Sequence, residues 1–176
     1  AALVSWMLIE RVRAGKPTLV GAATGLVAGL VVITPAAGFV EPWAAVVMGF
    51  VVSPVCYFAV SFLKRKLGYD DALDAFGIHA VGGVTGGVLA GLFCVPELSW
   101  TDFGGLVYTG DPTLLGAQVL GILVTVVFVG VLDVVLGFAV KACFKGSLRV
   151  SEAEEAQGLD VAAHGESAYP AYVGLD

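Results

Sequence analysis

The sequence predicts an all-α protein in which a bundle of helices crosses a membrane several times. Of its 176 residues, 58% are hydrophobic and only 14% are charged, whereas soluble domains carry about 25% charged residues. The charges are also unevenly spaced. Four stretches contain no Asp, Glu, Lys or Arg, and each exceeds the ~20 residues that a helix needs to cross a bilayer. They lie between Lys16 and Glu41, Glu41 and Lys64, Asp74 and Glu97, and Asp111 and Asp133.

The apolar stretches divide the chain into five membrane segments and a tail. We expect the end of one spanning helix at about 1–12, and four more at about 17–36, 42–66, 71–95 and 112–144. Residues 1–145 would then form a transmembrane bundle, and residues 146–176 a polar tail. The chain lacks an initiator Met and starts with apolar residues, so we expect a further N-terminal part of the protein to precede it.

The basic residues predict the orientation in the membrane. All nine occur at three places: Arg11, Arg13 and Lys16; Lys64, Arg65 and Lys66; and Lys141, Lys145 and Arg149. Because basic loops stay in the cytoplasm, the connections at 11–16 and 64–70 and the tail are expected there. The acidic loops near 37–42 and 96–111 would face outward. The net charge of −6 comes mostly from the tail, and the chain has no basic stripe for nucleic acid.

Glycines recur every four residues in two of the expected helices. Gly21, Gly25 and Gly29 follow this spacing in one helix, and Gly82 and Gly86 follow it in another. Small residues at this interval let helix backbones approach closely in lipid. We therefore expect both helices to lie inside a tight bundle rather than to face lipid.

The sequence predicts no cofactor and no metal site. Cys56, Cys94 and Cys143 stand in apolar stretches without paired spacing, and we expect them to be small buried hydrophobic residues. His164 lies in the acidic tail without a second ligand at metal spacing, so we expect a solvated side chain.

His79 is the histidine that falls in an expected membrane segment. Counted along a helix from Asp70, it lies about 13 Å in, on the same face as Gly82, Gly83 and Gly86. An ionisable residue at that depth is a functional candidate, and a structural bond to a neighbouring carbonyl is the alternative. In hydrocarbon the neutral imidazole is favoured. It offers one donor and one acceptor, which suits a small polar molecule or a proton relay.

Acidic residues accompany the membrane segments. Asp70 and Asp71 would cap the helix that holds His79 at the cytoplasmic surface. Asp74 is deeper, shares a helix face with Asp70, and is expected to have a specific partner. Asp133 stands alone in the last segment. Because a charge is costly in hydrocarbon, we expect its partner in another part of the protein.

Residues 70–83, DDALDAFGIHAVGG, resemble the DD-x-x-D-x-F-G-x-H-x-x-GG signature of the ammonium transporter (Amt/Mep/Rh) family. Shorter matches are found across essentially the whole chain, at 16–18, 28–30, 34–36, 63–65, 148–150, 154–155, 158–160 and 164–169. The chain is identified by this resemblance as the C-terminal half of a bacterial-type member.

The resemblance implies an eleven-helix subunit of a homotrimer in the plasma (inner) membrane, a transporter and not an enzyme. In this family ammonium loses its proton, and ammonia passes a hydrophobic pore between two facing histidines. His79 matches the second histidine, and Ala75 and Thr34 would line the same path. Asp71, Asp74 and Asp133 would be structural or proton-linked acids. The first pore histidine and a phenylalanine gate belong to the N-terminal half, which the chain would need as a partner.

The tail resembles the regulatory C-terminus of the bacterial members, to which P-II signalling proteins bind from the cytoplasm. The matching positions are Arg149, Gly158, Asp160, His164, Gly165, Glu166 and Tyr169. Ammonium or ammonia, the lipid bilayer and a P-II protein are thus the expected partners. Two alternatives remain open: an ammonium-sensing receptor on the same scaffold, and a fragment that serves assembly only.

Overall fold

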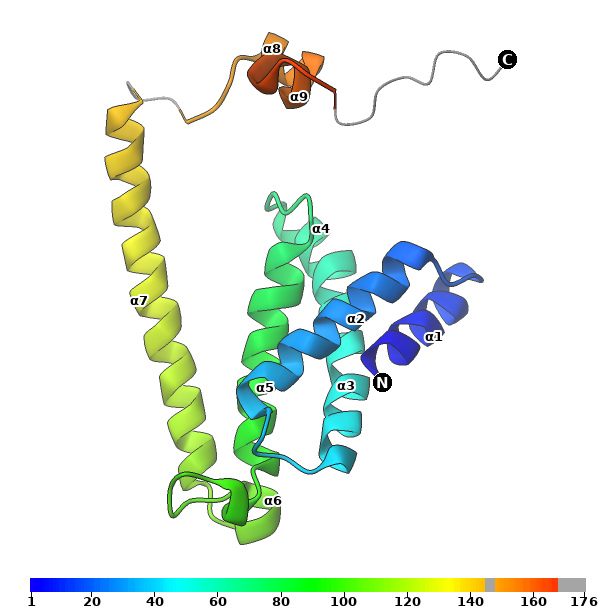
Figure 1. The fold of residues 1–176 in the computed structure, drawn as a ribbon, viewed down its shortest axis with the longest axis vertical. Helices are drawn as coiled ribbons and strands as arrows, with labels where there is room; N and C mark the ends of the chain where they lie inside the picture. The colour runs from blue at the N-terminus through cyan, green and yellow to red at the C-terminus, as the bar shows by residue number, and fades with distance from the viewer. Residues whose placement is uncertain (145–147, 168–176) are drawn as a thin grey trace. The chain divides into compact units, whose positions relative to one another are not determined.

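The computed structural model describes residues 1–144 and 148–167, and all regular elements in these ranges are helical (Figure 1). By their internal contacts the residues form two units, Ala1–Val126 and Val127–Asp176. The longer helices are α1 (Ala2–Ala14), α2 (Leu19–Ile33), α3 (Pro42–Phe58), α5 (Val81–Phe93) and α7 (Thr113–Cys143). The short ones are α4 (Lys64–Leu67), α6 (Leu106–Thr109), α8 (Glu152–Gln157) and α9 (Leu159–His164). Two 3₁₀ turns (Thr34–Ala36, Pro96–Leu98) and two π turns (Ala59–Leu63, Phe76–Ala80) complete the element order.

Within the described ranges, four helical stretches are long and apolar enough to cross a membrane. They are Leu19–Ala36, Pro42–Leu67, Phe76–Phe93 and Thr113–Cys143, which confirms the four complete segments expected from the sequence. The third of these begins five residues later than the expected start at 71. Residues 70–74 form a turn in which Asp74 has a φ of 55°. The expectation that Asp70 and Asp74 share a helix face is therefore wrong.

The core of Ala1–Val126 lies where α1, α2 and α3 pack together and α5 packs on α2 and α3. Its fully buried side chains include Val32, Met48, Val52 and Cys56. Glycine permits the closest approach. A Cβ at Gly25 would lie 2.5 Å from the Cβ of Trp6, and one at Gly86 would lie 2.4 Å from the carbonyl oxygen of Val32. The expected tight glycine packing of α2 and α5 is confirmed.

Helix α3 continues through Pro54 with help from α1. Proline has no N–H to donate to the carbonyl four residues earlier, which here belongs to Phe50. The Ser5 hydroxyl of α1 donates to that carbonyl oxygen at 3.1 Å. In return, the buried Ser53 hydroxyl of α3 donates to the Ala2 carbonyl oxygen at 2.7 Å. These two bonds fasten α1 to α3, and the first gives the Phe50 carbonyl the donor that Pro54 cannot supply.

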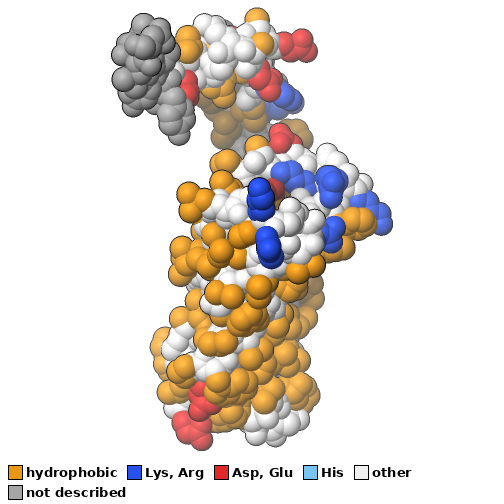
Figure 2. Space-filling view, turned by 90° about the vertical axis from the view of Figure 1, so that its right-hand side faces the viewer, with side chains coloured by type: hydrophobic (Ala, Val, Ile, Leu, Met, Phe, Trp, Pro, Cys, Tyr) orange, Lys and Arg blue, Asp and Glu red, His pale blue; other side chains and the backbone are white. Residues whose placement is uncertain are grey.

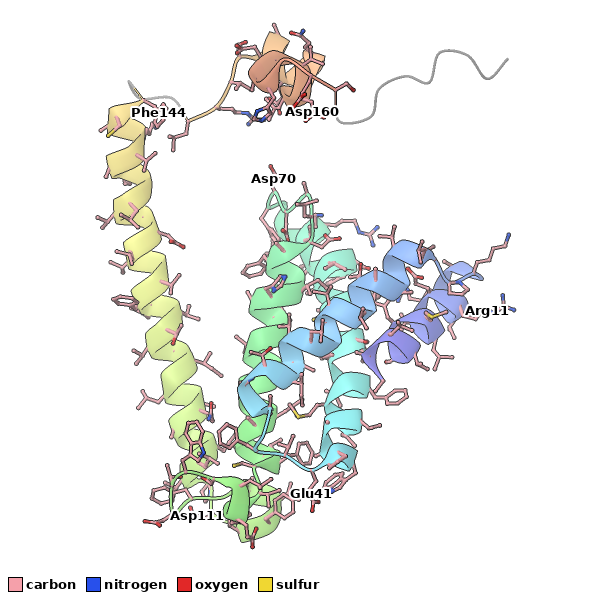
Figure 3. The ribbon with its side chains drawn as sticks, in the orientation of Figure 1. Arg11, Glu41, Asp70, Asp111, Phe144 and Asp160 are labelled. Carbon is pink, nitrogen blue, oxygen red and sulfur yellow. The ribbon has the colours of Figure 1, made fainter. Side chains whose placement is uncertain are left out.

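Acidic and basic connections gather at opposite ends of the unit Ala1–Val126. Figure 2 shows the Lys and Arg side chains of this unit, with a few acidic ones among them, at one end of an apolar surface, and only acidic side chains at the other end. Figure 3 labels Glu41 and Asp111 at the end far from Asp70. The two acidic loops contact each other: the Val95 amide donates to the Phe39 carbonyl at 2.8 Å, and the Tyr108 hydroxyl donates to Glu41 at 3.2 Å. The structure thus places the two acidic loops together, as alternating connections require.

The unit Val127–Asp176 holds most of α7 and the polar tail, and the described part of the tail contains two short helices. Ser151 begins α8 with a capping box, in which its hydroxyl accepts from the Glu154 amide and the Glu154 carboxylate accepts from the Ser151 amide. Gly158, with a φ of 94°, links α8 to α9. Arg149 forms an ion pair with Glu155 at 2.8 Å. The described tail is thus a folded helix pair.

The cysteines agree only in part with expectation. Cys56 and Cys94 are buried, whereas Cys143, the last residue of α7, is exposed. The expectation that all three are buried is therefore wrong for Cys143. None forms a disulfide in the described ranges.

Gly86→Ala should destabilise the protein, since the new methyl group would overlap the Val32 carbonyl, and overpacking of this kind costs about 1–3 kcal/mol. Gly83→Ala in the same helix is the control, because a Cβ there has nothing within 4 Å. The measurement is the thermal unfolding midpoint of the purified full-length protein in detergent. Equal midpoints for the two variants would contradict the packing described here.

The tail helices should lose stability in acid. The Ser151 hydroxyl and amide lower the pKa of Glu154 below its ordinary value of 4.5, and Arg149 lowers the pKa of Glu155 below 4.5 as well. Both contributions are present above 4.5 and are lost as the pH falls through the lowered values. Amide exchange protection in α8 should therefore decrease below pH 4.5 in the wild type. In E154Q/E155Q it should not change over this range, and an unchanged wild-type profile would refute the assignment.

Candidate functional site

His79 lies in the π turn Phe76–Ala80, directly before α5. It follows Phe76 by three residues, so it lies about 4.5 Å along the helix. The expected depth of about 13 Å was counted from Asp70 and is wrong, because residues 70–74 are not helical. The imidazole is exposed on this chain, so any burial of His79 must come from groups outside the described residues.

The packed face of this helix runs beside His79 and not through it. Ile78 and Gly82 are buried, and a Cβ at Gly82 would contact Val31 and Cys56. His79 is exposed and Gly83 is only partly buried. The expectation that His79 shares the face of Gly82 and Gly86 is therefore wrong: the histidine is on the neighbouring, open face.

Asp71 lies before the helix, and its carboxylate accepts hydrogen bonds from the first backbone amides of the helix. One carboxylate oxygen accepts from the Phe76 amide at 3.3 Å, and the other accepts from the Gly77 amide at 3.2 Å. These amides lack partners in the helix, as the first amides of any helix do. The expected capping role of Asp71 is confirmed, although the residue is five positions before Phe76 and is not the adjacent N-cap residue.

Asp74 has the specific partner that the sequence analysis expected. Its carboxylate is 2.8 Å from the Lys64 ammonium, and both side chains are half-buried. The same ammonium donates to the Asp71 carbonyl oxygen. Asp74 adopts a left-handed conformation, which is uncommon outside glycine but which Asp tolerates better than most residues. Lys64 therefore stabilises the turn through two contacts, one with the Asp74 carboxylate and one with the Asp71 carbonyl oxygen. From the sequence, Lys64 belongs to a cytoplasmic basic cluster and to the 63–65 family match, and its pairing with Asp74 is not predicted.

Two π turns meet at this point. Phe76–Ala80 carries His79, and Ala59–Leu63 ends at Lys64. They contact each other so closely that a Cβ on Gly77 would lie 2.4 Å from a methyl group of Val60. π turns are rare and are found frequently at functional sites. Thus, the cap, the ion pair and this contact together fix the backbone that carries His79.

An apolar groove begins at the residue after His79. It has a volume of about 390 Å³ and lies between α5 and the part of α7 before residue 127. Its lining is mostly apolar and includes Ala80, Gly83, Gly87, Gln118, Ile122 and Thr125. Such a lining offers little to an ion but accommodates a small neutral molecule.

The other residues assigned to the path are spread along the helices. Ala75 is exposed directly before the π turn. Thr34 is exposed too, and its hydroxyl donates to the Leu30 carbonyl at 2.7 Å. The next residue, Pro35, contacts Gly86, which is about 10 Å along α5 from His79. Thr34 and His79 are therefore not brought together.

Asp133 lies in α7 within the other unit and is exposed. The structure shows no hydrogen bond or ion pair for it within residues 1–144 and 148–167. Its role as a structural or proton-linked acid stays a prediction.

The tail positions form one short motif. Gly158 and Gly165 have φ angles of 94° and 73° at the two ends of α9, and the Glu166 amide donates to the Asp160 carbonyl at 3.2 Å. His164 is exposed at the end of α9. No group of metal-binding side chains is found in the described part of the chain. Tyr169, also assigned to the regulatory tail, lies outside the described residues.

Comparison with known proteins decides the family. The sequence model of the Ammonium Transporter Family matches residues 1–169. The chain belongs to the ammonium transporter family. It is 45% identical to the ammonium transporter of Bacillus subtilis and 46% identical to that of Aquifex aeolicus, over 96% of its length in each case. Both relatives are named transporters rather than enzymes.

Solved structures of the ammonium transporter family share the fold. Mep2 of Saccharomyces cerevisiae superposes with a TM-score of 0.77 at 38% identity, over 86% of this chain and 35% of that one. A structure described as a sensor Amt protein gives a TM-score of 0.77 at 29% identity. The chain spans 41% of the Bacillus relative and 38% of the Aquifex relative. It is a multi-pass α-helical membrane protein of this family.

Asp71→Ala should destabilise the turn that precedes His79. It removes both acceptors from the Phe76 and Gly77 amides, and the loss of a helix cap costs about 1 kcal/mol. Asp70→Ala is the control, because the carboxylate of Asp70 accepts from neither of these amides in the structure. Hydrogen exchange of residues 76–80 in the full-length protein should be about fivefold faster in D71A only. Equal exchange in the two variants would show that Asp71 is not the cap.

Proposed function

We propose that this chain is part of an ammonium transporter and that His79 contacts the permeating molecule. The observation that carries the proposal is the placement of His79 on the open face of a π turn, next to an apolar groove, in a member of this family. The turn is braced by Asp71 and by the Lys64–Asp74 pair. A braced backbone with an open imidazole suits a contact residue better than a packing residue, which would be buried.

The proposed mechanism follows from the cost of moving charge through hydrocarbon. Transfer of a bare ion to low dielectric costs several kcal/mol even after relaxation, so ammonium should release its proton before it enters the path. Ammonia is small and neutral, and it needs one donor and one acceptor to replace lost water contacts. A neutral imidazole supplies both. The apolar groove lining beyond Ala80 then excludes ions without binding ammonia tightly.

The proposal includes an assembly and a location. The chain would be the C-terminal half of an eleven-helix subunit in a homotrimer, with the first pore histidine supplied by the N-terminal half and His79 as the second. Residues 1–145 would be the membrane part and residues 146–176 a cytoplasmic regulatory tail in a plasma (inner) membrane protein. The separate acidic and basic ends of Ala1–Val126 support this orientation. The folded α8–α9 pair offers a shaped surface on which a P-II protein would bind.

The second candidate function is an ammonium-sensing receptor. It is favoured by the likeness to the structure described as a sensor Amt protein. A sensor would bind ammonium on the same scaffold and signal without net flux. Uptake measurements separate the two functions, because only the transporter requires an open path past His79.

His79→Ala should lower ammonium uptake by the full-length protein in cells that lack other ammonium transporters. The loss of one hydrogen bond to the permeating molecule, worth about 1 kcal/mol, slows passage roughly fivefold. Val12→Ala is the control and should transport normally, because Val12 is 85% exposed and belongs to no proposed site. Protein levels in the membrane should be equal. Unchanged uptake and selectivity in H79A would exclude the role of His79, and ammonium-dependent signalling without uptake by the wild type would favour the sensor.

A further inference from the structure

Lys64 connects the two π turns that meet beside His79. Its backbone amide donates to the carbonyl five residues earlier, which closes the π turn Ala59–Leu63. Its side-chain ammonium reaches the Asp74 carboxylate at 2.8 Å and also donates to the Asp71 carbonyl oxygen. One residue therefore ends the first π turn and holds the segment that leads into the second.

The first three amides of the second π turn, at residues 76–78, all donate to the two acids that Lys64 contacts. Two of them donate to the Asp71 carboxylate at 3.3 and 3.2 Å, and the third donates to the Asp74 carbonyl oxygen at 2.9 Å. His79 is the next residue in the sequence. The Lys64 ammonium therefore holds both residues on which the backbone before the histidine depends.

The winding of this turn decides which face of the helix His79 occupies. Residues three apart share a face of an α-helix, so His79 would then lie beside Gly82. In the observed turn, the Val81 amide donates to the Phe76 carbonyl five residues earlier, and the additional residue in the turn rotates the residues before Val81 relative to Gly82. Ile78 is consequently buried, at 4% exposure, and the imidazole of His79 stays open.

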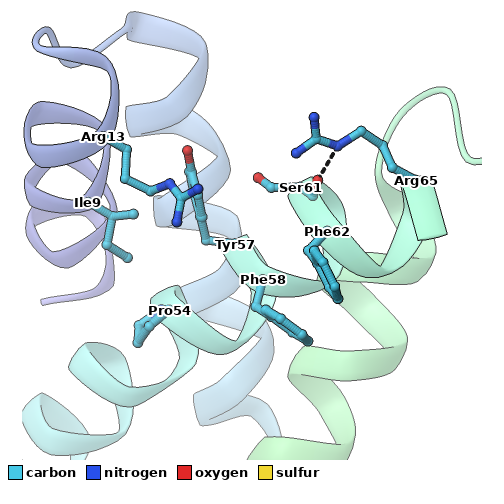
Figure 4. A pocket seen from close by; sticks show the side chains of 8 residues that line it. All are labelled: Ile9, Arg13, Pro54, Tyr57, Phe58, Ser61, Phe62 and Arg65. Carbon is cyan, nitrogen blue, oxygen red and sulfur yellow. Dashed lines mark hydrogen bonds between the residues drawn. The ribbon is translucent and has the colours of Figure 1, made fainter.

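The first π turn is fixed by contacts of its own. The Nε of Arg65 donates to the Ser61 carbonyl inside this turn, and the rings of Phe58 and Phe62 stack along it with their centroids 5.0 Å apart (Figure 4). Lys64 thus extends from a rigid support. Its ammonium holds the two acids in place and does not simply follow them.

We propose that Lys64 is a positioning residue for ammonia passage: its ion pair with Asp74 keeps the turn Phe76–Ala80 in the π form and thereby keeps the His79 imidazole on the open face. Without this charge, the three amide bonds lose their anchor, the turn relaxes to α winding, and His79 turns toward the packed face. The inference rests on the proposed contact between His79 and the permeating molecule. Lys64 acts through the backbone and not by touching that molecule.

The geometry suits lysine better than arginine. An ammonium carries three donors around one nitrogen, and this nitrogen serves both the Asp74 carboxylate and the Asp71 carbonyl oxygen. A guanidinium is flat and holds its donors in a fixed fork. We therefore expect Lys64→Arg to keep the charge but to reach only one of the two acceptors, so that it restores only part of the effect of the lysine.

Ammonium uptake by the full-length protein tests the inference, in cells that lack other ammonium transporters and at equal protein levels in the membrane. Lys64→Met should lower kcat about fivefold, because the displaced imidazole loses its hydrogen bond to the permeating molecule, and K64R should lie between K64M and the wild type. Lys66→Met is the control, since Lys66 belongs to the same basic run but lies over the Phe62 ring. In an H79A background, K64M should lower uptake no further.

The outcomes separate the positioning role of Lys64 from the proposed role of His79. A further fivefold loss in K64M/H79A, or the same loss in K66M as in K64M, would overturn the positioning role and leave the role of His79 intact. Unchanged uptake in K64M would overturn it too. Unchanged uptake in H79A would instead exclude the contact of His79, and the inference would fall with it.

Asp74→Asn gives a second variant that does not depend on the folding of the lysine variant. Asn tolerates a left-handed conformation as Asp does, so D74N removes the charge at a position where φ is 55° but keeps the backbone of the turn. Hydrogen exchange of residues 76–80 should be about fivefold faster in D74N than in the wild type, through loss of a charged hydrogen bond, and unchanged in K66M. Equal exchange in D74N and the wild type would overturn the proposal.

Discussion

Hydrocarbon leaves a backbone amide or carbonyl no water to bond to, and the local structure of this chain follows from that constraint. Pro54 shows it most directly. Pro54 leaves the carbonyl of Phe50 without its usual helical donor, and the hydroxyl of Ser5 from another helix donates to it at 3.1 Å. The first amides of the helix at Phe76 pose the same problem, and Asp71 supplies the acceptors. In both cases a polar side chain from outside the helix completes the hydrogen bonding of its backbone.

The same solvent changes what holds the helices together. Lipid is as apolar as a leucine side chain, so burial alone does not drive helices together, and close packing must do so. The glycines of α2 and α5 serve this purpose, because Gly25 admits Trp6 and Gly86 admits the Val32 carbonyl. Helix α7 differs: none of its residues is buried by the described part of the chain. Its large apolar surface is available to lipid or to other parts of an assembled protein.

The membrane segments could be predicted from the sequence because charge spacing and apolar length reflect the solvent directly. The start of the His79 helix could not. Residues 71–75 contain neither proline nor glycine to mark a break before the helix, and nothing in their sequence shows that Asp74 takes a φ of 55°. That conformation depends on Lys64, ten residues earlier, and on the Val60 contact at Gly77. These are tertiary effects, and they moved His79 off the packed face and toward the helix end.

The glycine spacing likewise predicts that the helices pack closely, but not which residues pack against each glycine. Gly82 and Gly83 are adjacent and equivalent by spacing, yet a Cβ would contact Val31 at Gly82 and nothing within 4 Å at Gly83. The tail helices, in contrast, were predictable. Ser151 and Glu154 have the spacing of a capping box, and Gly158 and Gly165 mark the ends of α9. They were missed because the acidic composition suggested a solvated segment.

The basic run 64–66 shows how one sequence feature separates into distinct physical roles. Successive helix residues point about 100° apart, so the three side chains cannot share a partner. Lys64 turns to Asp74 and braces the turn before His79. Arg65 donates to the Ser61 carbonyl oxygen, and Lys66 lies over the Phe62 ring at 5.7 Å. Asp74 neutralises Lys64 within the turn that precedes His79. The run therefore orients the helix through the sign of its charges and steadies the turn before His79 through one ion pair.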